Sequence, residues 1–306
     1  TQRLFFPRPG NAACKMRQIR PQIVVAATPG PFGALGVLLA KAFNSVLCVG
    51  YHTRYDELVG LYWLPAIAAV CARVLHKWDR LFLRIGGAVA VNSAEMALHA
   101  QRLGVSSVHQ VGTPISRQMI AQPPAPVNGG IQKVLFAGRL AAEKNIAQVL
   151  EAAERLPSIH FLIAGDGPLA DSVKNAAQYL PNLEFLQWVP RRQLVGVLDH
   201  CDVLVLPSKE EAFGTVALEA MARGRMVIVS SRCGILNWPS LSRGLFRIRR
   251  DESLAEAISR IDKLDAASKA GRAAAGRTAA VAFNDRALED WLNMFTQLNT
   301  AEGAAS

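Results

Sequence analysis

Two glutamates, eight residues apart, surround the start of a predicted helix in the second half of the chain. Glu211 ends a polar loop that follows an apolar strand, and Glu219 lies about two turns inside the helix. Three backbone amides at the helix start lack intrahelical partners and attract phosphate: those of Phe213, Gly214 and Thr215. Because a carboxylate repels phosphate, hydroxyl groups are the natural partners of the two glutamates. Phosphate with hydroxyls on both sides describes a nucleotide sugar.

The alternative interpretation treats both glutamates as solvated surface charges, which is the usual state of a glutamate. The helix around Glu219 argues against this, because it is otherwise apolar and a free carboxylate is costly in such surroundings. Its residues are Val216, Ala217, Leu218, Glu219, Ala220, Met221 and Ala222. The sequence alone leaves both interpretations open.

Alternating strands and helices must position these side chains. Apolar runs bounded by turn residues predict strands at 133–137, 160–164, 183–186, 203–206 and 226–229. Helical patterns lie between them, at 145–156, 169–177, 192–199 and 214–222. Repeated βα units are typical of an α/β fold with a parallel sheet and helices on both faces. The loops that follow the strands should therefore share one edge.

Two more loops at this edge carry suitable residues. Gly138 permits a ligand to approach the backbone closely, and Arg139 and Lys144 offer a planar fork and a point charge for a diphosphate. Gly165 begins a second glycine-rich turn, residues 165–168. Each signal is weak alone, since the third glycine of a dinucleotide-binding motif is missing. On one edge with the glutamate-flanked helix, they reinforce each other.

The first half of the chain predicts a similar but shorter alternation. Strands are expected at 23–26, 46–51, 88–91 and 108–111, with helices at 32–43, at 61–83 and after Ser93. His52 follows the strand at 46–51 directly, at the carboxyl end where open α/β sheets place their ligands. A lone histidine is also a common structural residue, so His52 has a catalytic and a structural interpretation.

Positive charge is concentrated in the first half. Residues 1–127 hold 13 Lys and Arg against 4 Asp and Glu, whereas residues 128–306 hold 21 against 20. This asymmetry favours an anionic partner, such as a membrane surface, a lipid phosphate or a polyanionic glycan. Nucleic acid is not expected as a partner, because aromatic residues are sparse and no nucleic-acid-binding motif is present. A basic surface that serves solubility is the alternative.

The predicted helix at 61–83 is amphipathic, and it bears directly on this choice. Its apolar positions are Trp63, Ile67, Val70, Val74, Leu75, Trp78 and Phe82, and its basic positions are Arg73, Lys77, Arg80 and Arg84. The pattern fits a helix that rests on a bilayer, and it fits a core helix with a solvated back. Residues 1–20, also basic, predict a helix or tail.

The cysteines and the hydropathy indicate in which cellular compartment we expect the protein. The five cysteines are scattered and odd in number, which favours reduced thiols in a cytoplasmic protein over disulfides or a zinc site. No uncharged run of eighteen apolar residues and no export signal is present. We therefore expect a cytoplasmic chain, with peripheral contact at the inner face of the membrane if the basic half binds lipid.

Three motifs of the second half resemble those of the GT-B glycosyltransferases of the large retaining family four. They are Gly138-Arg139-x4-Lys144, Ala164-Gly165-Asp166-Gly167-Pro168, and residues 207–214 (PSKEEAFG) running to Glu219-Ala220-Met221-Ala222-x-Gly224. In the first half, Tyr51-His52-Thr53-Arg54 resembles the strand-end histidine motif of the family, and Val91-Asn92-Ser93 resembles its later V-x-S segment. The resemblance covers about residues 20–265. Residues 45–63, with Thr28-Pro29-Gly30 before them, are similar to lipid-directed mannosyl- and sulfoquinovosyl-transferases.

This resemblance implies a role for each candidate residue. Arg139 and Lys144 would hold the donor diphosphate, Glu211 the hydroxyls of the donor sugar, and Glu219 the ribose, while His52 would face the reaction centre from the other domain. The expected catalytic residues are thus His52 and Glu211. The expected donor-binding residues are Gly138, Arg139, Lys144, Gly165, Glu211, Phe213, Gly214, Thr215 and Glu219. The family generally needs no metal, and this sequence has neither a D-x-D pair nor a histidine cluster with ligand spacing, so no metal or other cofactor is expected.

The resemblance also implies two Rossmann-like domains that face each other across a cleft. Residues 121–130 (AQPPAPVNGG) are the clearest predicted linker, since proline stiffens their first half and glycine loosens their second. We therefore expect an acceptor-side domain at 1–127, a donor-binding domain at 128–285, and a C-terminal helix and tail at 286–306. Two departures from the family stand out. The first domain lacks the usual first strand and Gly-rich loop, and Gly112-Thr113-Pro114-Ile115-Ser116 replaces an N-G-V-D-like turn.

Three functions remain after this comparison. The first is a retaining transferase that moves a sugar from a nucleotide diphosphate sugar to a lipid or glycan acceptor. The second is a noncatalytic nucleotide-sugar-binding fragment or partner subunit of such an enzyme. The third, an epimerase or phosphorylase on the same architecture, fits the donor site but does not predict the basic first half.

Overall fold

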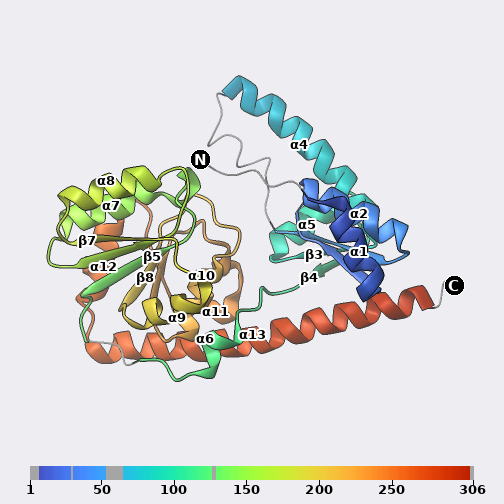
Figure 1. The fold of residues 1–306 in the computed structure, drawn as a ribbon. Helices are drawn as coiled ribbons and strands as arrows, with labels where there is room; N and C mark the ends of the chain where they lie inside the picture. Colours follow the sequence, from blue (N-terminus) through green and yellow to red (C-terminus); the bar gives the residue numbers. More distant parts are fainter. Residues whose placement is uncertain (1–6, 29, 53–64, 126–128, 304–306) are drawn as a thin grey trace. The chain divides into compact units, whose positions relative to one another are not determined.

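The structure, a computed structural model, describes residues 7–28, 30–52, 65–125 and 129–303. The chain divides into two compact units, each with its own sheet (Figure 1). Within the described residues, the first unit comprises residues 7–113 and 286–303, and the second unit comprises residues 114–285.

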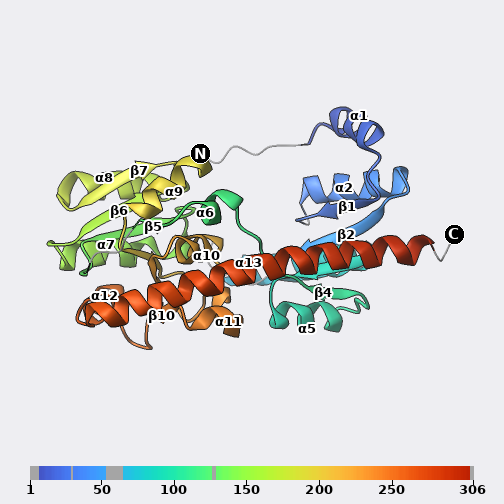
Figure 2. The same ribbon diagram turned by 90° about the horizontal axis from the view of Figure 1, so that it is seen from below.

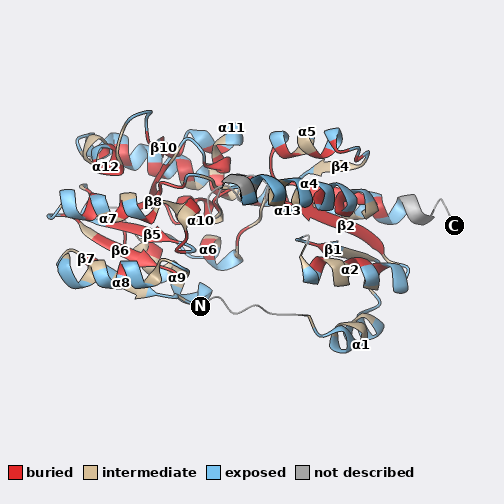
Figure 3. Ribbon diagram, turned by 90° about the horizontal axis from the view of Figure 1, so that it is seen from above, coloured by how far each residue is buried: buried red, intermediate tan, exposed pale blue. Residues whose placement is uncertain are grey.

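In the part of the second unit that the structure describes, six parallel strands form one sheet in the order β10-β9-β8-β5-β6-β7. The strands are β5 (Lys133–Ala137), β6 (His160–Ala164), β7 (Leu183–Gln187), β8 (Val203–Leu206), β9 (Met226–Val229) and β10 (Leu245–Arg247). Figure 3 shows that β5, β6 and β8 are buried, as expected for a parallel sheet covered on both faces. The predicted α/β class and the five predicted strands of this half are confirmed.

Helices connect these strands on both faces of the sheet. They are α6 (Arg117–Ala121), α7 (Ile146–Arg155), α8 (Ala170–Tyr179), α9 (Arg191–Asp199), α10 (Thr215–Ala222), α11 (Pro239–Ser242) and α12 (Leu254–Asp262), with short 3-10 turns η2 (Ala142–Lys144) and η3 (Gly234–Asn237). In Figure 1, α7 and α8 lie on one face and α9 on the other, and α12 packs beside α7. The predicted helices are confirmed, whereas β10 and α12 lie in a segment for which no element was predicted.

Among its described residues, the first unit contains four parallel strands in sequence order. They are β1 (Ile23–Ala26), β2 (Val46–Tyr51), β3 (Ala88–Val91) and β4 (Val108–Gln110). Its helices are α1 (Pro9–Ile19), α2 (Pro31–Ala42), α4 (Pro65–Ile85) and α5 (Ala94–Arg102). Ser93 caps α5 as predicted, since its Oγ accepts a hydrogen bond from the Met96 amide at 3.2 Å. Of the predicted helix at 61–83, residues 61–64 lie outside the described residues, as do residues 1–6 of the basic N-terminal segment.

One long helix, α13 (Ala266–Gly303), runs from the second unit into the first (Figure 2). Its last part covers one face of the four-stranded sheet, where Met294 and Leu298 pack against Val46 and Cys48 of β2. The alternate residues of β2 face a separate core that is shared with α2, α4 and α5. A C-terminal helix and tail were predicted at residues 286–306. Residues 286–303 are not a separate tail, however, because they supply one wall of the first unit's core.

The predicted linker at 121–130 is held firmly before its undescribed residues 126–128. The buried guanidinium of Arg223 donates to the carbonyl oxygens of Gln122 at 2.8 Å and Pro123 at 3.0 Å, and that of Arg225 donates to the Ala125 carbonyl. These bonds attach the segment to the second unit. Accordingly, the two units divide between residues 113 and 114, whereas the composition had suggested a boundary at residue 127.

All five cysteines, Cys14, Cys48, Cys71, Cys201 and Cys233, are free thiols. Burial raises the pKa of Cys48 to about 11 and the pKa values of Cys201 and Cys233 to about 12, so these three thiols stay protonated near neutral pH. Across the described part of the chain, no helix combines the length and the apolar character that crossing a membrane requires.

Candidate functional site

The candidate residues of the second unit gather at one edge of its sheet. The strands β8, β5 and β6 are parallel neighbours, so their carboxyl ends meet at the same edge. The residues that follow these ends are Gly138, Arg139 and Lys144 after β5, Gly165 after β6, and Glu211, Phe213, Gly214, Thr215 and Glu219 after β8. The prediction that these loops share an edge is therefore confirmed by the strand order.

The loops after β5 and β6 are joined by backbone hydrogen bonds. The Gly138 amide donates to the Ala164 carbonyl at 3.0 Å, and the Leu140 amide donates to the Asp166 carbonyl at 2.9 Å. A Cβ atom at Gly165 would lie 1.8 Å from the Gly138 carbonyl oxygen, so only glycine fits there. The glycine at 165 thus permits the close approach of two loops, which fixes the backbone that leads into Arg139.

Lys144 and Glu211 form an ion pair across two loops. The Lys144 Nζ atom lies 2.6 Å from Glu211 Oε2, and the two side chains are only 18% and 14% exposed. Backbone contacts hold the loops together, since the Lys209 amide donates to the Glu143 carbonyl at 2.8 Å and the Asn145 side chain donates to the Pro207 carbonyl at 3.2 Å. The cation expected for the diphosphate and the carboxylate expected for sugar hydroxyls are therefore direct neighbours.

At the start of α10, the backbone amides face this edge, and few side-chain atoms cover them. Gly214 precedes the helix with φ of +89°, a left-handed conformation that favours glycine. Phe213 is buried and its ring stacks on Phe283, with centroids 5.7 Å apart, so this residue contributes its amide and not its side chain. As the first helical residue, Thr215 has an amide with no intrahelical partner. The helix start thus has the character of an anion site.

Glu219 is buried within α10 and pairs with an arginine that the sequence analysis did not single out. The Arg191 Nη2 atom donates to Glu219 Oε1 at 2.8 Å, although the arginine side chain is 65% exposed. Burial raises the pKa of Glu219, and the hydrogen bond and charge of Arg191 partly oppose that shift. A signal for Arg191 was present in the sequence: Arg191 and Arg192 open α9, at a helix end where cations are normally disfavoured.

The edge as a whole carries groups that are chemically suited to anions and to hydroxyls. Arg139 is exposed, and no ion pair involving it is found among the described residues. Three cations, Arg139, Lys144 and Arg191, accompany the two carboxylates of Glu211 and Glu219. No group of three or more His, Cys, Asp or Glu side chains in the described ranges is placed to hold a metal ion.

His52 belongs to the first unit and is not among the residues gathered at this edge. It follows β2 directly and is half-buried, and its Nδ1 atom has no hydrogen-bond partner among the described residues. Burial lowers the pKa of His52, so its imidazole is neutral at pH 7. A Cβ atom at Gly50 would lie 3.1 Å from His52 Nε2, so the glycine leaves room for the ring. Its motif neighbours Thr53 and Arg54 lie outside the described residues.

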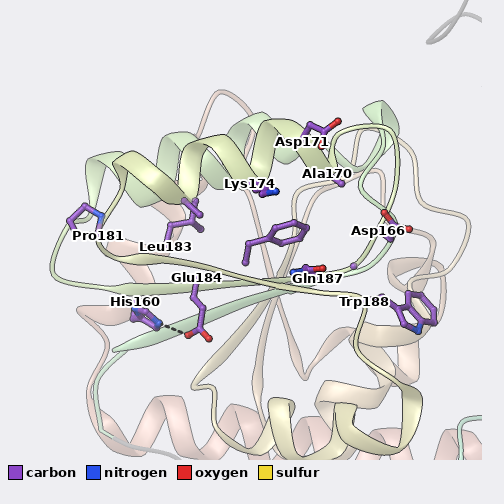
Figure 4. A pocket seen from close by; sticks show the side chains of 13 residues that line it. His160, Asp166, Ala170, Asp171, Lys174, Pro181, Leu183, Glu184, Gln187 and Trp188 are labelled. Carbon is purple, nitrogen blue, oxygen red and sulfur yellow. Dashed lines mark hydrogen bonds and ion pairs between the residues drawn. The ribbon is translucent and has the colours of Figure 1, made fainter. Parts of the chain in front are cut away.

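A cavity of about 720 Å³ lies between α8 and the edge strand β7. Figure 4 shows Asp166, Gln187 and Trp188 at one end of it and His160 and Pro181 at the other. It shares Gly165 with the candidate edge, but the charged candidates at that edge do not line it. The cavity thus adjoins the edge without containing the groups that would bind a diphosphate.

Comparison with known proteins agrees with this geometry. The family model described as glycosyl transferases group 1 matches residues 121–274, half of the chain. Sulfoquinovosyl transferase SQD2 of Arabidopsis thaliana is 27% identical over 234 residues, which cover 72% of this chain and 45% of that protein. A GDP-mannose-dependent alpha-(1-6)-phosphatidylinositol dimannoside mannosyltransferase of Mycobacterium tuberculosis is 30% identical over 133 residues, 42% of this chain and 35% of that protein. The chain thus spans less than half the length of these two relatives.

Solved structures share the fold. Sucrose-phosphate synthase from Thermosynechococcus elongatus superimposes with a TM-score of 0.76 at 21% identity, over 97% of this chain and 78% of that chain. HepE of Anabaena, solved in complex with UDP and glucose, has a TM-score of 0.66 at 18% identity, over 94% of this chain and 83% of that chain. The fold is thus α/β with two Rossmann-like units of the GT-B type. With half of its length matched by the family model, this chain belongs to the group 1 glycosyl transferases.

Proposed function

We propose that this chain transfers a sugar, with retention of its anomeric configuration, from a nucleotide diphosphate sugar to a lipid or glycan acceptor. The observation that supports this most directly is the arrangement at the carboxyl edge of β8, β5 and β6. There, cations and free helix-start amides lie beside two carboxylates, one of which, Glu211, contacts Lys144. The name of the mycobacterial relative, which includes GDP-mannose, adds support for a nucleotide-sugar donor.

In this proposal, Arg139, Lys144 and the amides at residues 213–215 bind the donor diphosphate. Negative charge grows on the leaving diphosphate as the glycosidic bond breaks. Groups placed at that position therefore stabilise the transition state more than the ground state. Gly138 and Gly165 let the backbone approach the donor diphosphate closely enough to contact it. We expect these groups to meet the need for positive charge without a metal ion, so that a chelator such as EDTA leaves the rate unchanged.

The carboxylates and His52 act on the sugar and the ribose. Glu211 accepts hydrogen bonds from hydroxyls of the donor sugar, Glu219 accepts them from the ribose, and His52 acts as a neutral imidazole near the donor sugar. Retention then follows from attack of the acceptor on the same face that the diphosphate leaves. Replacement of His52 by alanine should lower the rate with little change in donor affinity, and unchanged turnover would assign His52 a structural role.

The charge of the first half and the name of one relative support the proposed acceptor and location. A basic surface suits an acceptor with an anionic headgroup, and the name of the mycobacterial relative includes a phosphatidylinositol dimannoside. We therefore propose a cytoplasmic chain in peripheral contact with the inner face of a membrane.

Calorimetric titration tests the donor site first. The purified chain is titrated with UDP, GDP and ADP, and with UDP-glucose and GDP-mannose. We expect one base to bind, and Arg139→Ala to weaken its binding about 10-fold to 100-fold, because a charge-assisted bidentate contact is lost. The control Arg243→Ala changes an exposed arginine just before β10, at the opposite end of that strand, and should have no effect. Binding of no nucleotide would contradict the proposal, and binding without turnover on any acceptor would favour the noncatalytic alternative.

A further inference from the structure

The helix α4 has an exposed apolar stripe that the four-stranded sheet does not cover. Phe82 and Leu83 are buried on the side that faces the core of the first unit. Five apolar side chains elsewhere on the helix are between 42% and 61% exposed: Ile67, Val70, Val74, Trp78 and Leu81. Their spacing of three or four residues places them on one side of the helix, over about 21 Å of its length. An exposed apolar stripe of this kind is typical of a surface that binds a partner.

A row of basic side chains runs beside this apolar stripe. Arg73, Lys77 and Arg84 each follow a stripe residue by three positions, which places them next to it on the helix surface, and Arg80 extends the same row. All four are exposed. Asp79 is the only acidic residue of α4, and it is buried. The exposed side of the helix is therefore apolar along one line and purely cationic along the next.

We propose that α4 docks this chain on an anionic lipid bilayer, with the stripe in the boundary of the acyl chains and the basic row against the lipid phosphates. The apolar stripe matches the acyl-chain boundary of one leaflet, and the basic row matches the layer of lipid phosphates above it. Trp78 has an amphipathic ring, which favours the interface between these two layers. The excess positive charge of the first half complements the lipid charge. This inference deepens the proposed function by naming its membrane-contacting surface, and it rests on that function for its biological purpose.

A second copy of this chain is a less suitable partner for the stripe. In a symmetric dimer the same surface packs against itself. Four exposed cations on each copy would then lie near four on the other, without acidic side chains on the exposed side of α4 to neutralise them. The charge of the helix thus argues for an anionic surface over self-association.

Vesicle flotation of the full chain tests the inference. At about 0.1 M salt, we expect binding to vesicles of phosphatidylcholine with 30 mol% phosphatidylglycerol to exceed binding to phosphatidylcholine alone by at least about tenfold, and to fall at 0.5 M salt. Brominated lipids should quench part of the tryptophan fluorescence. That part should be missing in Trp78→Phe. Equal binding to both kinds of vesicle would overturn the role of the basic row.

Two triple variants separate the contributions of the stripe and the basic row. Changing Val70, Val74 and Leu81 to glutamine should reduce binding at least about tenfold through lost apolar burial. Changing Arg73, Lys77 and Arg80 to glutamine should reduce it about fivefold per side chain. Arg84 is left unchanged because its Nε atom donates to the Leu103 carbonyl at 3.1 Å.

Matched controls use exposed residues of the same unit away from α4. Leu38→Gln with Leu98→Gln changes two leucines that are 65% and 54% exposed on α2 and α5, and Lys41→Gln with Arg102→Gln removes two exposed charges. We expect each control to change lipid binding less than twofold. Controls that weaken binding as strongly as the α4 variants would overturn the assignment to α4.

Two further measurements complete the test. Sedimentation equilibrium of the wild-type chain and the apolar triple variant detects self-association. If the wild-type chain is a dimer, and only the apolar triple variant dissociates it while lipid binding stays unchanged, the stripe binds a second copy. That result would overturn the proposal. Nucleotide titration of every variant runs in parallel. Lost lipid binding with intact nucleotide binding supports the docking surface, whereas lipid binding by a chain that binds no nucleotide contradicts only the proposed transferase function.

Discussion

Arg191, exposed at the start of α9, donates a 2.8 Å hydrogen bond to the buried carboxylate of Glu219 on α10. The contact joins the loop after β7 to the helix after β8, and it brings a third cation to the edge where Arg139 and Lys144 lie. A ribose that binds Glu219 must share that carboxylate with Arg191 or displace the arginine. If the proposed donor site is correct, the ion pair couples donor binding to the position of the exposed Arg191 side chain.

Replacing Glu219 by glutamine should stabilise the fold while weakening donor binding. Burial raises the pKa of Glu219, so between the unfolded and folded pKa values the native state binds more protons than the unfolded state, and the free energy of unfolding falls as the pH rises. We expect Glu219→Gln to melt at a higher temperature than wild type at pH 7, with the difference shrinking as the pH falls through that window. Nucleotide affinity should drop about tenfold, because a charged acceptor is lost.

Thermal melts at several pH values, together with calorimetry, check this prediction. Glu154→Gln, on the exposed side of α7, is the control and should change neither quantity. A variant that melts lower than wild type at pH 7 would show that the Arg191 contact outweighs the burial of the charge.

The Lys144–Glu211 pair should be strongly coupled in both stability and turnover. Lys144→Met leaves a partly buried carboxylate without its partner, so we expect it to lower the free energy of unfolding by about 1–3 kcal/mol, more than Glu211→Gln does. The double variant should show a coupling energy of about 1 kcal/mol or more in urea denaturation. Each single variant should lower turnover at least about 100-fold.

The exposed pair Arg155–Glu151 on α7 gives a matched control for that cycle. Surface pairs four residues apart contribute about 0.3–0.5 kcal/mol, so its coupling energy should be smaller. Equal coupling in the two cycles would mean that burial does not strengthen the Lys144–Glu211 contact.

A methyl group at Gly165 should disrupt the edge. Because its Cβ atom would lie 1.8 Å from the Gly138 carbonyl oxygen, Gly165→Ala must move one of the two loops. We expect a loss of about 1–3 kcal/mol in stability and weaker nucleotide binding, since Arg139 follows Gly138 directly. The control is Gly196→Ala on α9, where no heavy atom lies within 4 Å of the added Cβ. It should gain about 0.5–1 kcal/mol, and a gain in Gly165→Ala as well would contradict the predicted clash.

Arg223→Met should release the segment at residues 122–125 from the rest of the second unit. The buried guanidinium makes two bonds to the Asp199 carboxylate, at 2.8 and 2.6 Å, besides those to the Gln122 and Pro123 carbonyls. Removing it leaves these acceptors unpaired, so we expect a loss of about 3–5 kcal/mol in urea denaturation. Limited proteolysis should cut near residues 119–125 faster than in wild type. The exposed Arg243→Met should behave as wild type, and unchanged proteolysis of Arg223→Met would show that other contacts hold the segment.

Much of the second unit could be predicted because its strands are continuous apolar runs separated by clear helical patterns. The strand β10 has only three residues, too few for a periodic signal, and was missed. The helix α12 had a readable signal, since Ser253 and Glu256 form a capping box. Local patterns thus explain both the successes and this last omission.

Contacts between distant residues explain what the sequence could not reveal. Proline and glycine in residues 121–130 predicted a free linker, but Arg223 and Arg225 bind it from about 100 residues further along the chain. In the same way, Arg191 reaches Glu219 across 28 residues, and no periodicity encodes that pair. The apolar neighbours of Glu219 argued against a solvated carboxylate without excluding it, and the structure buries this side chain.

The first unit is made of two segments that are far apart in the sequence, up to residue 113 and from residue 286, and this affects the order in which the protein folds. Its strands β1 to β4 leave the ribosome early, yet one face of their sheet is covered by Met294, Leu298 and their neighbours on α13, roughly 185 residues after β4. Closing so long a loop is slow, and the apolar face stays open to misassociation until then. The second unit, continuous from residue 114 to residue 285, carries no such delay. During synthesis, the unit whose strands appear first is therefore the one that completes its core last.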